Sequence, residues 1–397
     1  MTSDMPRVVL KKRRAQPFYY RHPWVFEGAI QRIEGEPETG SEAILVTDQG
    51  DPIARGLFNP HSKIKLRLYQ WDVDRPLDDA WLKNRIDRAL QRRERFPRHE
   101  SGSRLIFSEG DELSGLIVDC YADWLVVQFT SAALAVRQEA ILAHLQDRLH
   151  PAGVLLRAEK GIGEAEGLAL HEGLVFGENP PRPLFLEEHG VRYGVDLLEG
   201  QKTGFFLDQR ENRLAAASYA RGSRVLDVFC YSGGFGLNCL KSGTATQVVG
   251  IDVSESAIAL ATENARLNGL DSRTDYRVTS AFDALENFVA AGEKFDMVVL
   301  DPPRMTRSRH TVDKALKGYF SLNRLAIDLL PPGGILVTCS CSGLVSRDDF
   351  EQVLATVAMR SGRAIQVLES RGPAPDHPVS ISCPESNYLK CYICGIA

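Results

Sequence analysis

The sequence predicts an α/β protein in which a doubly wound C-terminal domain follows two smaller domains, and three observations support this. Beyond about residue 200, apolar strand-like runs alternate with helical patterns, which is typical of a parallel sheet. Residues 1–75 instead show short strand patterns separated by turn residues. Residues 76–195 mix strands with helical patterns, as in an α+β domain. We therefore expect three domains, at 1–75, 76–195 and 196–397.

The composition is that of an ordinary globular protein. The 397 residues are 44% hydrophobic and 25% charged with a net charge of −5, which excludes wholesale disorder and a uniformly basic nucleic-acid-binding surface. No run approaches about 20 apolar residues, and the N-terminus lacks the apolar segment of a secretion signal. The eight cysteines are sparse and mostly lie in strand-like runs. We expect a soluble cytoplasmic protein with no membrane segment.

The first predicted domain has a local excess of basic residues. Residues 1–67 contain eleven Lys and Arg against eight Asp and Glu. Charged and apolar residues alternate from 63 to 69, which predicts a strand with one basic face. The first 75 residues are thus predicted to form a small β-barrel that carries basic strands.

A glycine-rich turn opens the C-terminal domain. Residues 225–236 (VLDVFCYSGGFG) form a buried strand, a turn and the start of a helix, and glycines there let a ligand approach the backbone. The next strand ends in Asp252, nineteen residues after Gly233, which suits ribose hydroxyls. Asp227 would repel a pyrophosphate but suits a cation. We therefore favour S-adenosylmethionine over NAD; the alternative is a turn that merely closes the strand–helix junction.

The fourth strand of this domain, 295–300, is followed by Asp301-Pro302-Pro303-Arg304. Two prolines end the strand and stiffen the turn. A carboxylate held rigidly at the carboxyl edge of a sheet can bind the amino edge of a base such as cytosine. Asp301 is thus a candidate for substrate binding, with an ordinary loop as the alternative.

The fifth strand brings two cysteines, Cys339 and Cys341, to the same edge. Carbon C5 of a pyrimidine is a poor nucleophile, but a thiolate added at C6 makes C5 reactive toward a sulfonium methyl group. Buried core cysteines are the alternative. Cys391 and Cys394 lie on opposite faces of a terminal strand and have no further ligands, so we expect them in the core and expect no metal site.

These motifs resemble those of the bacterial large-subunit (23S) ribosomal RNA cytosine-C5 methyltransferases. The resemblance rests on GQKTGFFLDQR (200–210), VLDVFCYSGGFG, LDPPR, KGYFSLNRLA and PPGGILVTCSCSG, and it covers essentially the whole chain. It implies an N-terminal PUA domain, a central domain to which the tetrad EEHG (187–190) belongs, and a C-terminal Rossmann-like class I methyltransferase domain. It also implies 5-methylcytidine as the product, ribosomal RNA as the partner and a homodimer.

The resemblance implies a role for each matching residue. Cys341 would be the nucleophile on C6, and Asp301 would bind and polarise the target base. Asp252 would hold the cofactor ribose, and the other implied cofactor contacts are Asp227, Ser232, Gly233, Gly234, Lys202, Thr203, Phe206 and Arg210.

Three positions depart from the family pattern. Ser280 stands where the family usually has an acidic residue that meets the adenine, so this contact is weakened or passes to the backbone. Cys339 is an extra thiol on the same face of the strand as Cys341, either a spare or an assistant. Arg304 follows Asp-Pro-Pro where many RNA cytosine methyltransferases have a cysteine that releases the product, so a different base must remove the C5 proton.

RNA binding follows from the same resemblance. Basic side chains would meet phosphates, which adds affinity but little sequence preference, and the target base would leave its stack. The candidate RNA-binding residues are Lys11, Lys12, Arg13, Arg14, Lys63, Lys65, Arg67 and Arg304.

Two other functions remain open at this point. The same scaffold could methylate another ribosomal RNA atom, such as a guanine nitrogen, which needs no cysteine. The chain could also be an inert RNA-binding or ribosome-assembly factor, although the intact Asp227, Asp252, Asp301 and Cys341 argue against decay.

Overall fold

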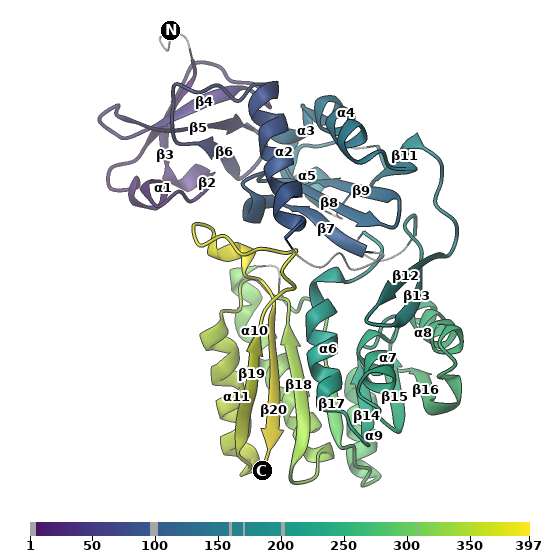
Figure 1. The fold of residues 1–397 in the computed structure, drawn as a ribbon. Helices are drawn as coiled ribbons and strands as arrows, with labels where there is room; N and C mark the ends of the chain where they lie inside the picture. The colour runs from purple at the N-terminus through teal and green to yellow at the C-terminus, as the bar shows by residue number, and fades with distance from the viewer. Residues whose placement is uncertain (1–4, 96–101, 159–160, 170, 200–202, 307) are drawn as a thin grey trace. The chain divides into compact units, whose positions relative to one another are not determined.

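The computed structural model describes residues 5–95, 102–158, 161–169, 171–199, 203–306 and 308–397 (Figure 1). The chain divides into two compact units. The first comprises Met1–Leu184, Val195–Phe205 and Pro375–Ser386, and the second comprises Phe185–Gly194, Phe206–Ala374 and Asn387–Ala397. The predicted α/β class is confirmed. Among the described residues, no helix is both long and apolar enough to cross a membrane.

The first unit begins with a six-stranded sheet in the order β2-β6-β5-β4-β1-β3. The predicted strand at 63–69 is confirmed as β6 (Ile64–Gln70), and apolar residues from several strands, among them Val8, Leu45 and Leu66, form the core. The other elements are β1 (Arg7–Leu10), α1 (Gln16–Tyr19), β2 (Trp24–Phe26), β3 (Ile30–Glu34), β4 (Glu42–Val46) and β5 (Pro52–Phe58).

A five-stranded sheet in the order β11-β10-β9-β8-β7 follows in the same unit. The helix before its first strand is α2 (Asp79–Arg93), and the Asp78 side chain caps it by accepting a hydrogen bond from the Trp81 backbone. The remaining elements are β7 (Gly102–Phe107), β8 (Leu116–Tyr121), β9 (Trp124–Phe129), α3 (Ala132–Ala135), α4 (Gln138–Leu149), β10 (Gly153–Leu156), α5 (Ile162–Glu166) and β11 (Gly173–Gly177).

The second unit is built around a seven-stranded sheet in the order β16-β15-β14-β17-β18-β20-β19. Its strands are β14 (Arg224–Val228), β15 (Gln247–Asp252), β16 (Thr274–Val278), β17 (Met297–Leu300), β18 (Gly334–Ser340), β19 (Ile365–Arg371) and β20 (Lys390–Ile396). All pairs are parallel except the two that β20 makes, which are antiparallel. The alternation of strands and helices predicted beyond residue 200 is therefore confirmed.

Helices connect these strands. The last of them, α11 (Arg347–Ser361), begins with a capping box between Ser346 and Asp349. The other helices are α6 (Arg210–Ser218), α7 (Gly234–Lys241), α8 (Glu255–Leu267), α9 (Ala281–Ala290) and α10 (Val312–Leu329), and a hairpin of β12 (Leu184–Glu188) and β13 (Val191–Val195) precedes them.

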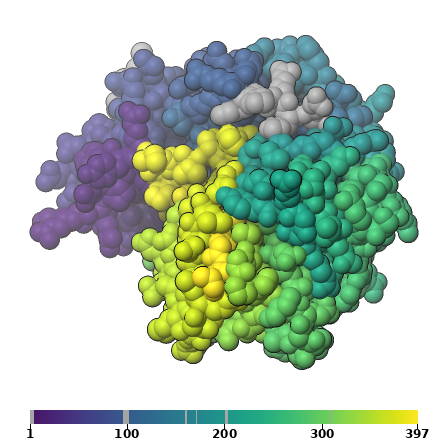
Figure 2. Space-filling model, turned by 60° about the horizontal axis from the view of Figure 1, so that its bottom comes forward, coloured from purple at the N-terminus to yellow at the C-terminus, as the bar shows by residue number. Residues whose placement is uncertain are grey.

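The antiparallel direction of β20 places its first residue at the carboxyl edge of the parallel strands. Lys390 pairs with Ser340, the last residue of β18. In Figure 1 β20 runs down to the C-terminus, so the carboxyl ends of β14, β17 and β18 lie at the upper edge of this sheet. Figure 2 shows the other end of the unit, where the last residues of the chain (yellow) reach the surface.

Candidate active site

The glycine-rich turn lies between β14 and α7. Gly233 has a φ of +80°, and a Cβ there would lie 2.5 Å from the Tyr276 hydroxyl oxygen, so both backbone and space require glycine. The Tyr231 backbone N–H donates to the Asp252 carboxylate at 3.1 Å, which ties the turn to the end of β15. The buried Ser232 accepts a hydrogen bond from Asn264 through its carbonyl oxygen at 3.1 Å. The turn is therefore held rigidly at the edge of the sheet.

Three carboxylates influence one another at this edge. Asp227 is buried and accepts a hydrogen bond from the Gly236 backbone at 2.8 Å. The pKa of Asp227 is raised to about 7, chiefly by burial and also by the charges of Asp301 and Asp252, while the Gly236 hydrogen bond and the charge of Arg213 act in the opposite direction. A cationic ligand would relieve this repulsion, whereas a pyrophosphate would add to it. The negative charge of these carboxylates fits the sulfonium and ammonium groups of S-adenosylmethionine.

Asp301 is oriented by a residue that sequence reasoning missed. The Gln209 side-chain amide donates to Asp301 Oδ1 at 2.8 Å, and Gln209 Oε1 accepts from Asn212 at 2.6 Å. Gln209 lies within the quoted segment 200–210, but 92 residues separate it from Asp301. No local pattern could indicate this contact. Gln209 therefore fixes the direction of a carboxylate that the sequence had already singled out.

The two candidate cysteines have different surroundings. Cys341 lies just beyond the end of β18 and is half-buried, with its Sγ 3.7 Å from the Pro302 carbonyl oxygen. Cys339 lies inside the strand with no exposed surface, opposite Cys391 of β20. A hydrogen bond with Cys391 and burial raise the pKa of Cys339 well above its ordinary value. The two roles predicted for Cys339, a spare or an assistant to Cys341, stay predictions, and its buried position favours packing within the strand.

Polar groups that the sequence did not reveal surround Cys341. The Tyr319 hydroxyl is hydrogen-bonded to Ser340 and Ser342, the neighbours of Cys341 on either side, at 3.0 Å each. The Met305 backbone N–H donates to Ser342 Oγ at 3.1 Å, which links the loop after β17 to the loop after β18. The loop that carries the thiol is thus fixed on both sides.

The other predicted cofactor contacts are divided between the two units. Phe206 and Arg210 belong to the second unit, where the Phe206 ring packs edge-on against Tyr231 of the glycine-rich turn, with centroids 5.2 Å apart. Thr203 belongs to the first unit and donates to the Asp119 carboxylate at 2.5 Å. Lys202 lies outside the described residues. Ser280 is the N-cap of α9, and its contact with an adenine stays a prediction.

Glu188 of the EEHG tetrad has a structural partner. Its two carboxylate oxygens accept hydrogen bonds from Arg213 at 2.7 and 2.6 Å, and both side chains are buried. Arg213 also donates to the Phe206 carbonyl at 3.1 Å, and a Cβ on Gly234 would lie 2.9 Å from its Cδ. This ion pair therefore supports the segments that border the glycine-rich turn.

The predicted basic face of β6 requires a correction. Lys63 is exposed and Lys65 is half-buried, but Arg67 is buried. Its guanidinium donates to Glu166 Oε1 at 3.2 Å and to the Ser114 hydroxyl at 3.1 Å, and lies 3.5 Å from Glu109. The prediction that Arg67 meets a phosphate is wrong, because its charge is already compensated. Other predicted RNA-binding residues, Lys11, Lys12, Arg13, Arg14 and Arg304, are exposed.

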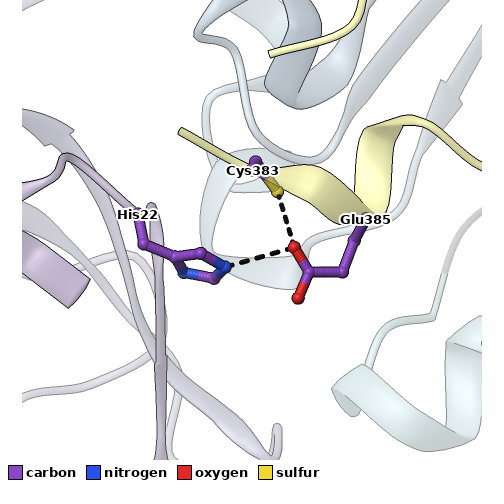
Figure 3. A group of neighbouring side chains, drawn as sticks. All are labelled: His22, Cys383 and Glu385. Atoms are coloured by element: carbon purple, nitrogen blue, oxygen red, sulfur yellow. Dashed lines mark hydrogen bonds and ion pairs between the residues drawn. The ribbon is translucent and has the colours of Figure 1, made fainter. Parts of the chain in front are cut away.

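One group in the described part of the chain combines side chains that could ligate a metal: His22, Cys383 and Glu385 (Figure 3). His22 Nε2 lies 3.2 Å from Glu385 Oε2, and Cys383 Sγ lies 3.5 Å from the same oxygen. The Trp24 backbone N–H donates to His22 Nδ1, so Nε2 carries the ring hydrogen and donates to Glu385. This tautomer favours a hydrogen-bonded cluster over a metal centre.

Known proteins are similar to this chain over nearly its whole length. A family model for S-adenosylmethionine-dependent methyltransferases matches residues 176–381, and a model for PUA-like domains matches residues 8–71. The chain is 39% identical over 393 residues to Ribosomal RNA large subunit methyltransferase I of Enterobacter sp. (strain 638), covering 98% of this chain and 99% of the relative. The protein of the same name from Yersinia pseudotuberculosis (strain IP 31758) is also 39% identical, with the same coverage.

Solved structures share the fold. The crystal structure of a methyltransferase complexed with SAH has a TM-score of 0.86 at 19% identity, over 98% of this chain and 99% of that chain. A protein from Streptococcus mutans assigned as a SAM-dependent methyltransferase has a TM-score of 0.85 at 18% identity, with the same coverage. The cofactor of the chain is S-adenosylmethionine. The chain belongs to the family of S-adenosylmethionine-dependent methyltransferases with a PUA-like domain that includes Ribosomal RNA large subunit methyltransferase I.

Proposed function

We propose that the protein methylates carbon C5 of a cytosine in large-subunit ribosomal RNA, with Cys341 as a covalent nucleophile. The observation that carries this proposal is the position of the Cys341 thiol. It lies 3.7 Å from the Pro302 carbonyl oxygen, in the loop that Asp301 begins, at the ends of adjacent strands β17 and β18. A nucleophile and a base-binding carboxylate thus face the same edge of the sheet. The names of the relatives indicate the class of RNA.

The residues around the glycine-rich turn would hold the cofactor. When bound, S-adenosylmethionine supplies an electrophilic methyl group attached to a sulfonium. Asp227 and the turn from Ser232 to Gly234 would hold its methionine part, and Asp252 would accept hydrogen bonds from the ribose. The remaining contacts that we assign to this ligand in the second unit are Phe206, Arg210 and Ser280. A role of Thr203, which belongs to the first unit, stays a prediction.

The Cys341 thiolate attacks C6 of the cytosine, and the new C6–S bond moves the electron pair of the C5–C6 double bond onto C5. C5 becomes nucleophilic and would take the methyl group from the sulfonium, whose methyl–sulfur bond breaks and leaves its electron pair on sulfur as a neutral thioether. A base then takes the proton from C5, and the released electron pair restores the double bond while the C6–S bond breaks. Asp301 accepts a hydrogen bond from the amino group of the base and holds it in register, with Gln209 fixing the carboxylate.

RNA would bind through exposed basic residues, and the target base would leave its stack to reach the site. Arg304 is exposed three residues after Asp301, where it can hold a phosphate beside the target. Arg67 is excluded from this set because its guanidinium is buried. The other basic residues that we assign to RNA phosphates are Lys11, Lys12, Arg13, Arg14, Lys63 and Lys65.

Methyl transfer from labelled S-adenosylmethionine to unmodified large-subunit ribosomal RNA tests this proposal. Wild type, Cys341→Ala and Cys339→Ala are compared, and the product nucleosides are identified by mass. We expect 5-methylcytidine from the wild type, retained product with Cys339→Ala and none with Cys341→Ala. Methylguanosine as the product, or full activity of Cys341→Ala, would contradict the proposal.

A further inference from the structure

Lys390 is a buried cation beside the candidate nucleophile. Its side chain is only 2% exposed, at the first position of β20, opposite Ser340 in the register with β18. The ammonium donates to three backbone carbonyl oxygens, those of Ser342 at 2.8 Å, Val345 at 2.7 Å and Tyr388 at 2.9 Å. An ammonium has three N–H donors, so all of them are in use.

No carboxylate of the described residues lies within 4.0 Å of this ammonium. A buried charge without a counter-ion is costly. The pKa of Lys390 is lowered to about 8, chiefly by burial and also by the charge of Arg347, whereas negative charge on Cys341 or Asp349 acts in the opposite direction. A thiolate at Cys341 would therefore compensate part of the buried charge of Lys390.

Within the described residues, the titratable groups coupled to the site beside Lys390 include a tyrosine, a carboxylate and a second thiol. Tyr319 of α10 is kept neutral, because burial raises its pKa to about 12, and the charges of Cys341 and Asp301 act in the same direction. Asp301, after β17, is acidic, and Cys339 of β18 is a buried thiol. Lys390 of β20 is a described cation that interacts with the charge of Cys341 and is hydrogen-bonded to the next residue, Ser342.

We propose that Lys390 is a positioning residue for Cys341: its fixed ammonium stabilises the thiolate and holds the loop that carries it. Two of its three acceptors, Ser342 and Val345, lie in the loop that follows Cys341. This inference rests on the proposed function, because a thiolate is needed only if Cys341 is the nucleophile. Lys390 does not exchange a proton during the reaction, since its N–H groups remain bound to carbonyl oxygens.

The pH dependence of Cys341 alkylation by iodoacetamide tests this directly. The rate is followed for the Cys341 peptide by mass spectrometry in wild type, Lys390→Met and Lys390→Arg, with the half-buried Cys120 as an internal reference. We expect the midpoint for Cys341 in wild type to lie below the ordinary thiol value of about 8.5. Lys390→Met should raise this midpoint by about one pH unit or more, whereas Lys390→Arg should keep it low.

Unchanged midpoints in Lys390→Met would overturn the proposal. A purely structural role would change the rate at every pH without moving the midpoint. If Lys390→Met does not fold, the wild type still decides, because a Cys341 midpoint at or above about 8.5 contradicts the proposal. Alkylation needs no RNA, so the two proposals can fail separately. A low midpoint for Cys341 together with methyl transfer by Cys341→Ala would contradict the proposed function but not the effect of Lys390 on the thiol.

Discussion

Two clusters of charged residues, one in each unit, are built in opposite ways. In the first unit, Arg67 is enclosed by carboxylates of opposite charge, Glu166 at 3.2 Å and Glu109 at 3.5 Å. In the second unit, Asp227 is close enough to Asp301 and Asp252 for their like charges to raise its pKa. In the first cluster opposite charges compensate one another, whereas in the second like charges repel one another, and a bound cation would relieve this repulsion. Arg67 and the three aspartates were singled out in the sequence, but only the aspartates carry the unbalanced charge that a cationic ligand would compensate.

The difference teaches how to separate binding charges from structural ones. Glu166 accepts hydrogen bonds from Asn59, Ser62 and the Ala132 backbone in addition to Arg67. A group whose donors and acceptors are satisfied within the protein has little left for a ligand. Unbalanced charge at the end of a strand is the more informative sign of function.

The largest expected effect is on stability. Arg67→Met removes the cation between Glu166 and Glu109 and leaves both carboxylates uncompensated. We expect the free energy of unfolding to fall by about 3 kcal/mol. The measurement is urea unfolding, with Arg32→Met on β3 as the matched control. Arg32 is 53% exposed in its pair with Glu34, so its loss should cost under about 1 kcal/mol. Equal losses of unfolding free energy in the two variants would contradict the view that Arg67, unlike Arg32, has a structural role.

Much of the fold and part of the candidate site could be predicted from the sequence, because these features depend on local patterns. The strand before Asp301, the strand at 63–69 and the glycine-rich turn follow from periodicity and turn residues. The burial of Arg67 could not be predicted from the sequence, since its partner Glu166 is 99 residues away. The contacts of Gln209 with Asp301 and of Lys390 with Ser342 are likewise formed only by folding.

A second expected effect concerns the pH dependence of cofactor binding. The pKa of Asp227 is raised to about 7, so its carboxyl is mostly neutral at pH 5.5 and half ionised at pH 7.0. Only the ionised form attracts a sulfonium or ammonium, so affinity should rise with pH. We expect the affinity for S-adenosylmethionine to rise on the order of tenfold from pH 5.5 to pH 7.0. Calorimetry with S-adenosylmethionine measures it.

Asp227→Asn is the control for this prediction. The amide keeps an acceptor for the Gly236 backbone but carries no charge. Its binding of S-adenosylmethionine should be weaker at pH 7.0 and should lose the pH dependence. An unchanged pH profile in Asp227→Asn would show that a different group titrates, and the acidic cluster would then not be the ligand site.

The smallest expected effect is on RNA affinity. Lys12 and Arg13 are exposed after β1, unlike Arg67, and their combined replacement by alanine should weaken RNA binding several-fold. The slope of log affinity against log salt concentration should fall by roughly 1.5, since two phosphate contacts are lost. Arg266→Ala on α8, which removes an exposed cation paired with Glu263, is the control and should leave the slope unchanged. A slope that falls equally in both would contradict the assignment of the basic run.

The central claim is the covalent bond between Cys341 and the target base. Ribosomal RNA that contains 5-fluorocytidine tests it most directly. Fluorine replaces the hydrogen at C5, so after methyl transfer no proton is left for a base to remove, and the C6–S bond should persist. Incubation with S-adenosylmethionine should give a stable protein–RNA adduct, and peptide mass spectrometry should locate it on Cys341. Methyl transfer to the RNA without such an adduct, or an adduct on another cysteine, would contradict the account.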